Sequence, residues 1–389
     1  MTDFDDIRPY NDDEVRPVLD RILADPELAD AVARLKFPRL AGPFGFILRP
    51  LVRSVMTRQL AAVDSVDKFQ LVVEKYMRHM IETTTTSLTN SGLDKLDPQQ
   101  AYLFVSNHRD IAMDPAFVNW SLYHAGFKTL RIAIGDNLLT KEYVSDLMRL
   151  NKSFIVKRSV KAPREKLKAA KTLSAYIFHS LTEDKANIWI AQREGRAKDG
   201  NDSTNSAVVG MLTLNRPKTQ DFSEYVHSLN IVPVSISYEQ DPCDRAKAHE
   251  LHAQRTTGRY EKGDQEDVQS IAKGIAGQKG HVHVAFGEPL RGDYSDSDAV
   301  ADEIDRQVWA NYVLHASNCF AYEQTGGEAR SLPYSDKKRP FEPGNLRDER
   351  ASFDLHIGAT PSEYRDIVLG MYANPVRNKL KAQGVATAK

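Results

Sequence analysis

The spacing of apolar and polar residues changes along the chain. Residues 60–83 repeat apolar side chains at helical spacing, with charged residues between them, and this predicts a helix. A β-branched run at 83–86, which Ser91 and Gly92 terminate, predicts a short strand directly after it. From about Gly92 onward, short apolar runs alternate with longer amphipathic stretches, so a different architecture begins there.

This alternation predicts an α/β fold. The apolar runs predict strands at 101–106, 130–134, 153–156, 187–191, 231–237 and 281–286. The stretches between them predict helices at 115–125, 138–147, 163–180 and 204–215. Such a succession is typical of a central, mostly parallel or mixed sheet that is flanked by helices.

The two ends of the chain predict further helical parts. We expect an N-terminal acidic tail and a basic, apolar helical region over 1–83, a main domain over 84–290, and a C-terminal helical and loop extension over 291–389. Within the extension, 296–322 predicts one helical stretch, 331–350 an extended surface loop, and 361–379 a last helix.

Composition narrows the class of protein. Apolar residues make up 41% of the 389 residues and charged residues 27%, which is typical of a globular chain. The net charge of −1 argues against a generally basic nucleic-acid coat protein, so we expect no nucleic-acid partner. With Cys243 and Cys319 alone, a disulfide framework or a cysteine-rich zinc site is excluded, and a reducing cytoplasm is the simplest compartment.

Charge is distributed unevenly near the N-terminus. Residues 1–30 hold ten acids and three bases, so we expect neither a secretory signal nor a transit peptide there. Residues 31–60 hold six bases and no acid, together with many Phe, Leu, Ile and Val residues. This composition fits a segment lying on an anionic membrane surface, and it fits equally a helix docked on its own domain. No apolar run approaches the ~18–20 residues of a membrane-spanning helix.

The stretch 106–115 carries the first candidate chemistry. His108 leaves a short apolar strand, and the acids Asp110 and Asp114 occur within the next six residues. A carboxylate that binds one ring nitrogen can fix the tautomer of a histidine, which leaves the other nitrogen free to take a proton from a hydroxyl. Taken alone, the same residues could equally be a helix-capping histidine and a loop aspartate.

Three later strand ends strengthen the catalytic interpretation. Lys157 and Arg158 end the strand expected at 153–156. The strand at 187–191 leads into Glu194-Gly195-Arg196, and Pro233 lies in the strand at 231–237, where proline suits an edge or a strand start. Sheets of this kind present ligand sites at their strand ends.

Together these four blocks resemble the glycerolipid acyltransferase family with the His-Asp motif, which includes glycerol-3-phosphate and 1-acylglycerol-3-phosphate acyltransferases. The blocks occur in family order over roughly 84–290. Two departures stand out. Five residues separate His108 from Asp114 where the family has four, and Glu194-Gly195-Arg196 lacks the usual threonine. We prefer Asp114 to Asp110 because its continuation, Asp-Pro-Ala-Phe-Val, matches the family's pattern after the aspartate.

The resemblance implies transfer of a fatty acyl group from acyl-CoA or acyl carrier protein to a hydroxyl of glycerol 3-phosphate or lysophosphatidate, in phospholipid synthesis. It implies that His108 is the general base and that Asp114 orients it. It implies a substrate-binding set of Asn107, Arg109, Lys157, Arg158, Glu194, Gly195, Arg196 and Pro233. It implies no metal or cofactor, and a cytoplasmic enzyme peripherally associated with the inner face of an anionic membrane.

Two alternatives remain open at this level. The chain could be a catalytically inactive lipid-binding or scaffolding protein that keeps the fold, or an acyltransferase with another lipid or amino-acid-lipid acceptor. The basic stretch 151–180, with eight bases and one acid, could bind coenzyme A, an acidic carrier protein or lipid headgroups, or could simply be solvated. Gly274, Gly277 and Gly280 predict a turn before the last strand, on which His281 and His283 would share a solvated face.

Overall fold

The computed structural model describes residues 4–37, 40, 42, 44–263 and 266–385, and it divides into two compact units. Unit 1 comprises Met1–Tyr76 and Arg131–Tyr176, and unit 2 comprises Met77–Leu130 and Ile177–Lys389. The chain leaves unit 2 after Leu130 and returns to it after Tyr176, so neither unit is one continuous stretch of the sequence. Each unit is therefore described by itself.

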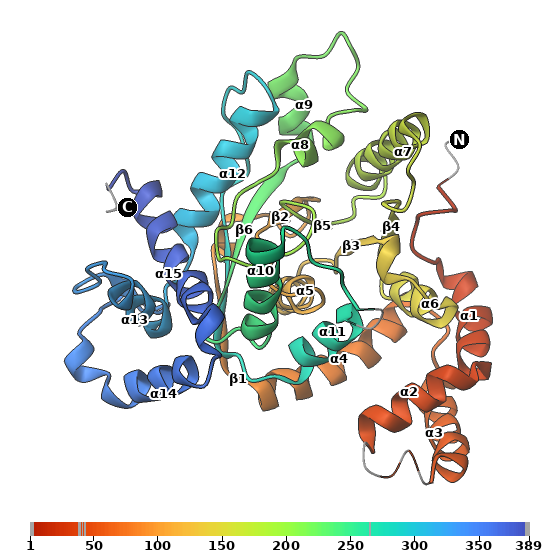
Figure 1. Cartoon of the computed structure of the whole chain (residues 1–389). Coiled ribbons are helices and arrows are strands. Elements are labelled where there is room, and N and C mark those ends of the chain that lie inside the picture. The colour runs from red at the N-terminus through yellow and green to blue at the C-terminus, as the bar shows by residue number, and fades with distance from the viewer. Residues whose placement is uncertain (1–3, 38–39, 41, 43, 264–265, 386–389) are drawn as a thin grey trace. The chain divides into compact units, whose positions relative to one another are not determined.

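Unit 1 is mainly helical, and its elements run from red to yellow in Figure 1. Its elements are α1 (Asp12–Ala24), α2 (Pro26–Lys36), α3 (Gly45–Leu60), most of α4 (Val66–Thr84), β3 (Arg131–Gly135), η2 (Asp136–Leu138), α6 (Glu142–Leu150), β4 (Ser153–Val156) and the first part of α7 (Pro163–Thr182). Strands β3 and β4 pair in parallel. Apolar residues of α1, α4 and α6 form one core that includes Val15, Leu19, Phe69 and Leu150.

Unit 2 contains the sheet that carries the candidate chemistry. Its strands are β1 (Thr85–Ser91), β2 (Leu103–Ser106), β5 (Ile188–Ala191), β6 (Ile231–Tyr238) and β7 (Gly280–Phe286), in the order β1-β7-β6-β2-β5. The pairs β1–β7, β6–β2 and β2–β5 are parallel, whereas β6–β7 is antiparallel. All residues of β2 and β6 are buried, which explains their continuous apolar runs. The expected α/β fold with a mixed sheet and flanking helices is confirmed.

Helices and short elements make up the rest of unit 2 (Figure 1). They are η1 (Leu93–Lys95), α5 (Met113–His124), α8 (Ser206–Leu212), α9 (Phe222–Ser228), α10 (Asp244–Thr257), α11 (Glu266–Ala276), α12 (Ser297–Asn311), α13 (Ala316–Gln324), β8 (Pro333–Tyr334), β9 (Arg339–Pro340), η3 (Pro343–Asn345), α14 (Arg347–Gly358), η4 (Ser362–Tyr364) and α15 (Arg365–Ala382). Among the described residues, no helix combines the length and apolarity that crossing a membrane requires.

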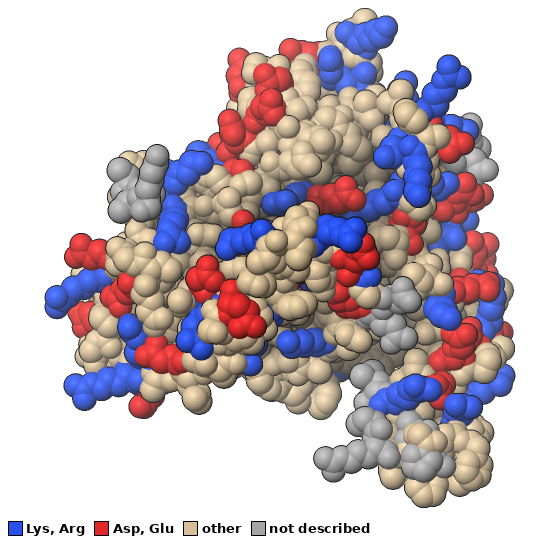
Figure 2. All heavy atoms as spheres, viewed as in Figure 1, with Lys and Arg blue, Asp and Glu red and all other residues tan. Residues whose placement is uncertain are grey.

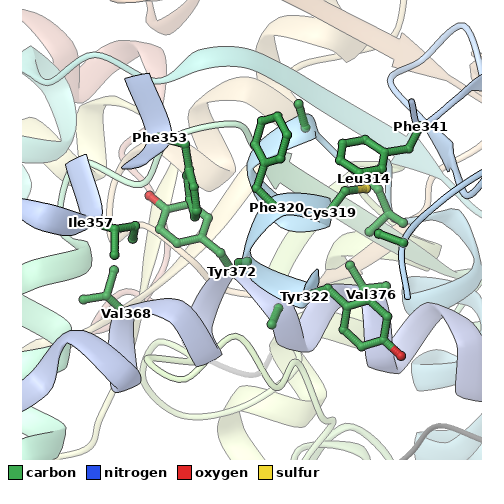
Figure 3. Packing of buried hydrophobic residues seen from close by; sticks show 14 of the residues in the cluster. Leu314, Cys319, Phe320, Tyr322, Phe341, Phe353, Ile357, Val368, Tyr372 and Val376 are labelled. Atoms are coloured by element: carbon green, nitrogen blue, oxygen red, sulfur yellow. The ribbon is translucent and has the colours of Figure 1, made fainter. Parts of the chain in front are cut away.

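The C-terminal extension has its own apolar core. Figure 3 shows aromatic side chains of α13, α14 and α15, among them Phe320, Phe353 and Tyr372, packed together. Two expectations for this part were wrong. The stretch 296–322 is two helices, broken at 312–315 because Tyr312 and Leu314 turn into the core. The stretch 331–350 is partly ordered, since β8 pairs with β9 and α14 begins at Arg347.

Three local expectations in the sheet region were also wrong. Pro233 lies in an interior strand, which tolerates it because the pairing of β6 with β7 begins only at Val234. Gly274 is part of α11 and not of a turn. His283 is buried, because its ring binds the hydroxyls of Thr89 and Ser91 on the neighbouring strand β1.

Candidate active site

His108 and Asp114 meet at the end of β2. His108 lies two residues beyond the strand, and Asp114 lies in the first turn of α5. The Nδ1 atom of His108 lies 2.9 Å from Oδ2 of Asp114, whose side chain is fully buried, while the histidine side chain keeps 13% exposure. Because an ionised carboxylate only accepts hydrogen bonds, Nδ1–H donates to it and Nε2 is left as the basic nitrogen. No described residue hydrogen-bonds Nε2.

The local turn explains the five-residue spacing. Oδ1 of Asp110 accepts hydrogen bonds from the backbone N–H groups of Ala112 and Met113, at 3.0 and 2.9 Å, and so caps the start of α5. Asp114 then reaches back to the same loop, since its Oδ2 accepts from the backbone N–H groups of Arg109 and Asp110 at 2.6 and 2.9 Å. The extra residue is therefore taken up in a capped turn, and Asp114 rather than Asp110 is the acid bonded to His108.

Asp110 has a different electrostatic environment from Asp114. Burial and the neighbouring carboxylate of Asp114 raise the pKa of Asp110 above its ordinary value. Its carboxyl group also packs closely against α11 at Gly274. A Cβ atom added to this glycine would lie only 2.1 Å from Oδ2 of Asp110. Asp110 thus shapes the loop on which His108 sits.

Tyr238 holds the second oxygen of the Asp114 carboxylate. Its hydroxyl donates to Oδ1 of Asp114 at 2.6 Å from the end of β6. Burial and the charge of Asp114 raise the pKa of Tyr238 well above the ordinary value, so the phenol stays protonated and remains a donor. The Tyr238 hydroxyl thus joins the N–H groups of His108, Arg109 and Asp110 as donors to this carboxylate.

The two residues that flank His108, Asn107 and Arg109, are buried and hydrogen-bonded to neighbouring parts of the fold. The amide of Asn107 bridges to β6, accepting from the backbone N–H of Ile236 at 2.7 Å and donating to its carbonyl at 3.0 Å. Asn107 and Arg109 both point to Asp202, at 3.2 and 3.4 Å. Arg109 is 3% exposed, and Lys247 donates to its carbonyl at 2.6 Å. This arrangement gives Asn107 and Arg109 a role in holding the loop.

The Glu194-Gly195-Arg196 turn lies next to the histidine. The backbone N–H of Ala197 donates to the carbonyl of His108 at 2.9 Å, which joins this turn directly to the loop that carries His108. Gly195 has φ +75°, a backbone conformation that favours glycine. The Nη1 atom of Arg196 is buried and, among the described residues, has no hydrogen-bond partner. A buried, unpaired guanidinium nitrogen is suited to bind an anionic group of a ligand.

The other expected binding residues lie elsewhere in the fold. Lys157 and Arg158 come directly after β4 in unit 1, where Lys157 pairs with Asp6 at 3.1 Å and the backbone N–H of Arg158 donates to Asp136 at 3.0 Å. Pro233 is buried within β6, opposite Val105 of β2. The role of these three residues in substrate binding stays a prediction.

Sequence reasoning missed three residues around His108. Tyr238 and Asp202 are separated from the motif by many residues, and Trp189 lies in the middle of β5. The indole of Trp189 meets the His108 ring edge to face, with centroids 5.7 Å apart, and its N–H donates to the hydroxyl of Ser106 at 3.0 Å. Only for Tyr238 was there a signal, namely a phenol at the end of a strand whose neighbours in the sheet carry the motif.

The buried cysteines are poorly suited to act as nucleophiles. Burial raises the pKa of Cys319 to about 12 and also raises that of Cys243. The reactive form of cysteine is the thiolate, which such environments disfavour. Within the described part of the chain, no group of three His, Cys, Asp or Glu residues is placed to hold a metal ion.

One comparison with known proteins matches the region that carries the candidate site. Residues 87–237 match the protein family described as Acyltransferase, a stretch that is less than half of the chain but includes every expected site residue. The match covers the region that carries the four blocks, and it agrees with the resemblance noted in the sequence.

Two further comparisons add little to this assignment. Among solved structures, the chain is similar to the 1-acyl-sn-glycerophosphate (LPA) acyltransferase PlsC from Thermotoga maritima, with 15% identity, a TM-score of 0.36, and coverage of 76% of this chain and 94% of that one. So distant a likeness carries no argument about substrate. No curated protein matches the chain.

Proposed function

We propose that this acyltransferase moves a fatty acyl group from an acyl thioester to a hydroxyl of glycerol 3-phosphate or lysophosphatidate. The single observation that supports it most is the bond between His108 and Asp114 at the end of β2, within the matched family region. The complete pair argues against an inactive binding protein, because a buried, fully hydrogen-bonded carboxylate aimed at a histidine is the arrangement that general-base catalysis needs.

The proposed reaction is direct transfer. Nε2 of His108 takes the proton of the acceptor hydroxyl as its oxygen attacks the thioester carbonyl, and Asp114 stabilises the imidazolium that forms. The tetrahedral intermediate collapses, the C–S bond breaks, and the imidazolium returns the proton to the leaving thiolate. No acyl-enzyme is formed, which agrees with the buried state of Cys243 and Cys319.

Arg196 is the residue that we propose binds the acceptor phosphate. Its unpaired Nη1 and the link of its turn to His108 support this role. Glu194 and Gly195 are exposed on the same turn and would shape the acceptor pocket. If Arg196 binds ground state and transition state alike, Arg196→Ala raises the KM of the acceptor more than it lowers kcat.

We further propose that α3 contacts the membrane that holds the lipid acceptor. Its outward apolar side chains include Phe46, Ile47, Leu51 and Val55, which are between 45% and 74% exposed. The surface at α3 is largely uncharged in Figure 2, and Arg53 and Arg58 are exposed on the same helix. Each basic residue near an anionic bilayer contributes about 1 kcal/mol. Arg39, one of the six bases of this segment, lies outside the described residues.

The structure refines the test of this contact. Arg49 pairs with Asp30 at 2.8 Å, so its replacement would break an ion pair as well as remove a charge. The better variant is Phe46→Ser with Leu51→Ser, and Leu355→Ser, on an equally exposed residue of α14, is the control. We expect the double variant, but not the control, to lose cosedimentation with anionic vesicles. Unchanged binding would mean that α3 serves another contact.

The function is tested with labelled acyl-CoA. Purified protein is incubated with glycerol 3-phosphate or lysophosphatidate, and the lipid products are separated. We expect an acylated product with one of these acceptors. Transfer to a different lipid hydroxyl would keep the reaction class and change the acceptor, and the absence of transfer from any thioester would contradict the proposal.

A further inference from the structure

Helix α7 has two halves of different character. Residues 161–168, which include its first turns, are all exposed, whereas the second half packs through Leu173, Tyr176, Ile177 and Leu181. The helix therefore begins as a projection into solvent and becomes part of the core only later. All of its lysines and arginines lie in the projecting part or within one turn of it.

The projecting part presents one distinct face. Arg164, Leu167, Lys168 and Lys171 recur at helical spacing, and we call this set the basic α7 face. It spans about 10 Å along the helix axis and lies on the side away from Leu173, Ile177 and Leu181. Leu167 is 51% exposed at its centre. The three cations have no ion-pair partner among the described residues, and Figure 2 shows Lys and Arg side chains gathered near α7.

Arg164 lies in the first turn of α7 and does not stabilise the helix. Positive side chains are unfavourable near a helix N-terminus, where the macrodipole favours acids. Glu165 is the one acid in the first turn, and it points about 100° away from Arg164 around the helix. Because the three cations also have no ion-pair partner among the described residues, they are available to an external anion.

The shape of the face distinguishes among anions. A nucleotide phosphate needs cations that converge on it, whereas these three are spaced along a convex helix. A membrane contact needs an apolar surface such as that of α3, and here Leu167 stands alone. A small protein–protein interface has an apolar centre and a polar rim. On the basic α7 face, Leu167 would form the centre and the cations the rim of a contact with an acidic partner.

We propose that the basic α7 face docks an acidic carrier protein that delivers the acyl group as its thioester. This proposal rests on the proposed acyl transfer from a thioester donor, and it names the donor's docking surface. Electrostatic steering by the face would speed encounter with the carrier, and salt would weaken it.

The test compares two donors that carry the same acyl chain. Initial rates are measured with palmitoyl acyl carrier protein and with palmitoyl-CoA, for the wild type and for the triple variant Arg164→Glu, Lys168→Glu, Lys171→Glu. We expect the triple variant to raise KM for the carrier-protein donor at least tenfold at low salt, with kcat within twofold, and to leave palmitoyl-CoA kinetics unchanged. The matched control replaces Arg330, Lys337 and Arg347, which are exposed on the C-terminal extension, by glutamate.

Each of the following outcomes contradicts the docking proposal but leaves the proposed acyl-transfer reaction unaffected. Equal losses with both donors would assign the face to coenzyme A, and a loss confined to anionic vesicle binding would assign it to the membrane. No change with either donor would make it a solvated helix face. If the wild type transfers from neither donor, the proposed function fails, and titration of holo carrier protein with wild type and triple variant then decides the docking surface by itself.

Discussion

Tyr238 offers the sharpest test of how the site is organised. Tyr238→Phe removes the 2.6 Å hydrogen bond to Oδ1 of Asp114 and changes no apolar contact. A hydrogen bond to a charged group contributes about 1.5–3 kcal/mol, and three donors still hold Oδ2 of the same carboxylate. We therefore expect a loss of about 1–2 kcal/mol in transition-state stabilisation, which is about tenfold in kcat.

The pattern of the loss distinguishes positioning from general damage. Because Tyr238 touches Asp114 and not the substrate, KM should change little.

The matched control is Tyr312→Phe, since the Tyr312 hydroxyl is buried without a hydrogen-bond partner among the described residues and its loss should cost nothing. The reasoning is refuted if Tyr238→Phe keeps the wild-type kcat.

Three further predictions concern neighbouring features. Asp114→Asn should lower kcat nearly as far as loss of the histidine, while Asp110→Asn lowers it much less; steady-state rates decide, and a reversed order would make Asp110 the orienting acid. Gly274→Ala should destabilise the protein, because the new Cβ would meet Asp110, although alanine normally favours a helix over glycine by about 1 kcal/mol. Gly370→Ala should instead stabilise the protein, because its Cβ has open space. Urea unfolding measures the change in the free energy of unfolding for each variant. Burial and the nearby His281 lower the pKa of His283 to about 4, so the unfolded chain takes up a proton first as pH falls from about 6.5; the wild type should lose about 2 kcal/mol more than His283→Gln between pH 7 and pH 5, and equal losses would contradict this.

Local pattern was enough to predict most of the strands and the motif. The strand at 153–156 has the predicted bounds, and the buried strands β2 and β6 differ from expectation by one or two residues, because both are short, continuous apolar runs of the kind that buried strands form. The preference for Asp114 rested on the residues directly after it, and the structure bonds that acid to His108.

Contacts between distant residues were not predictable in the same way. Tyr238 lies 124 positions from Asp114, and Asp202 lies 93 from Arg109, so no spacing rule could join them. The sequence of its own strand predicts that His283 is solvated. The hydroxyls that bind its ring come from the neighbouring strand β1. Such pairings depend on strand order, which a single sequence does not specify.

The central claim is that His108 is the general base of a direct acyl transfer. The most direct measurement is the rate of labelled acyl transfer by His108→Ala, with circular dichroism and unfolding to show that the fold is kept. The account predicts a loss of about a hundredfold or more with the fold intact. Near-wild-type turnover by a correctly folded His108→Ala protein would contradict it.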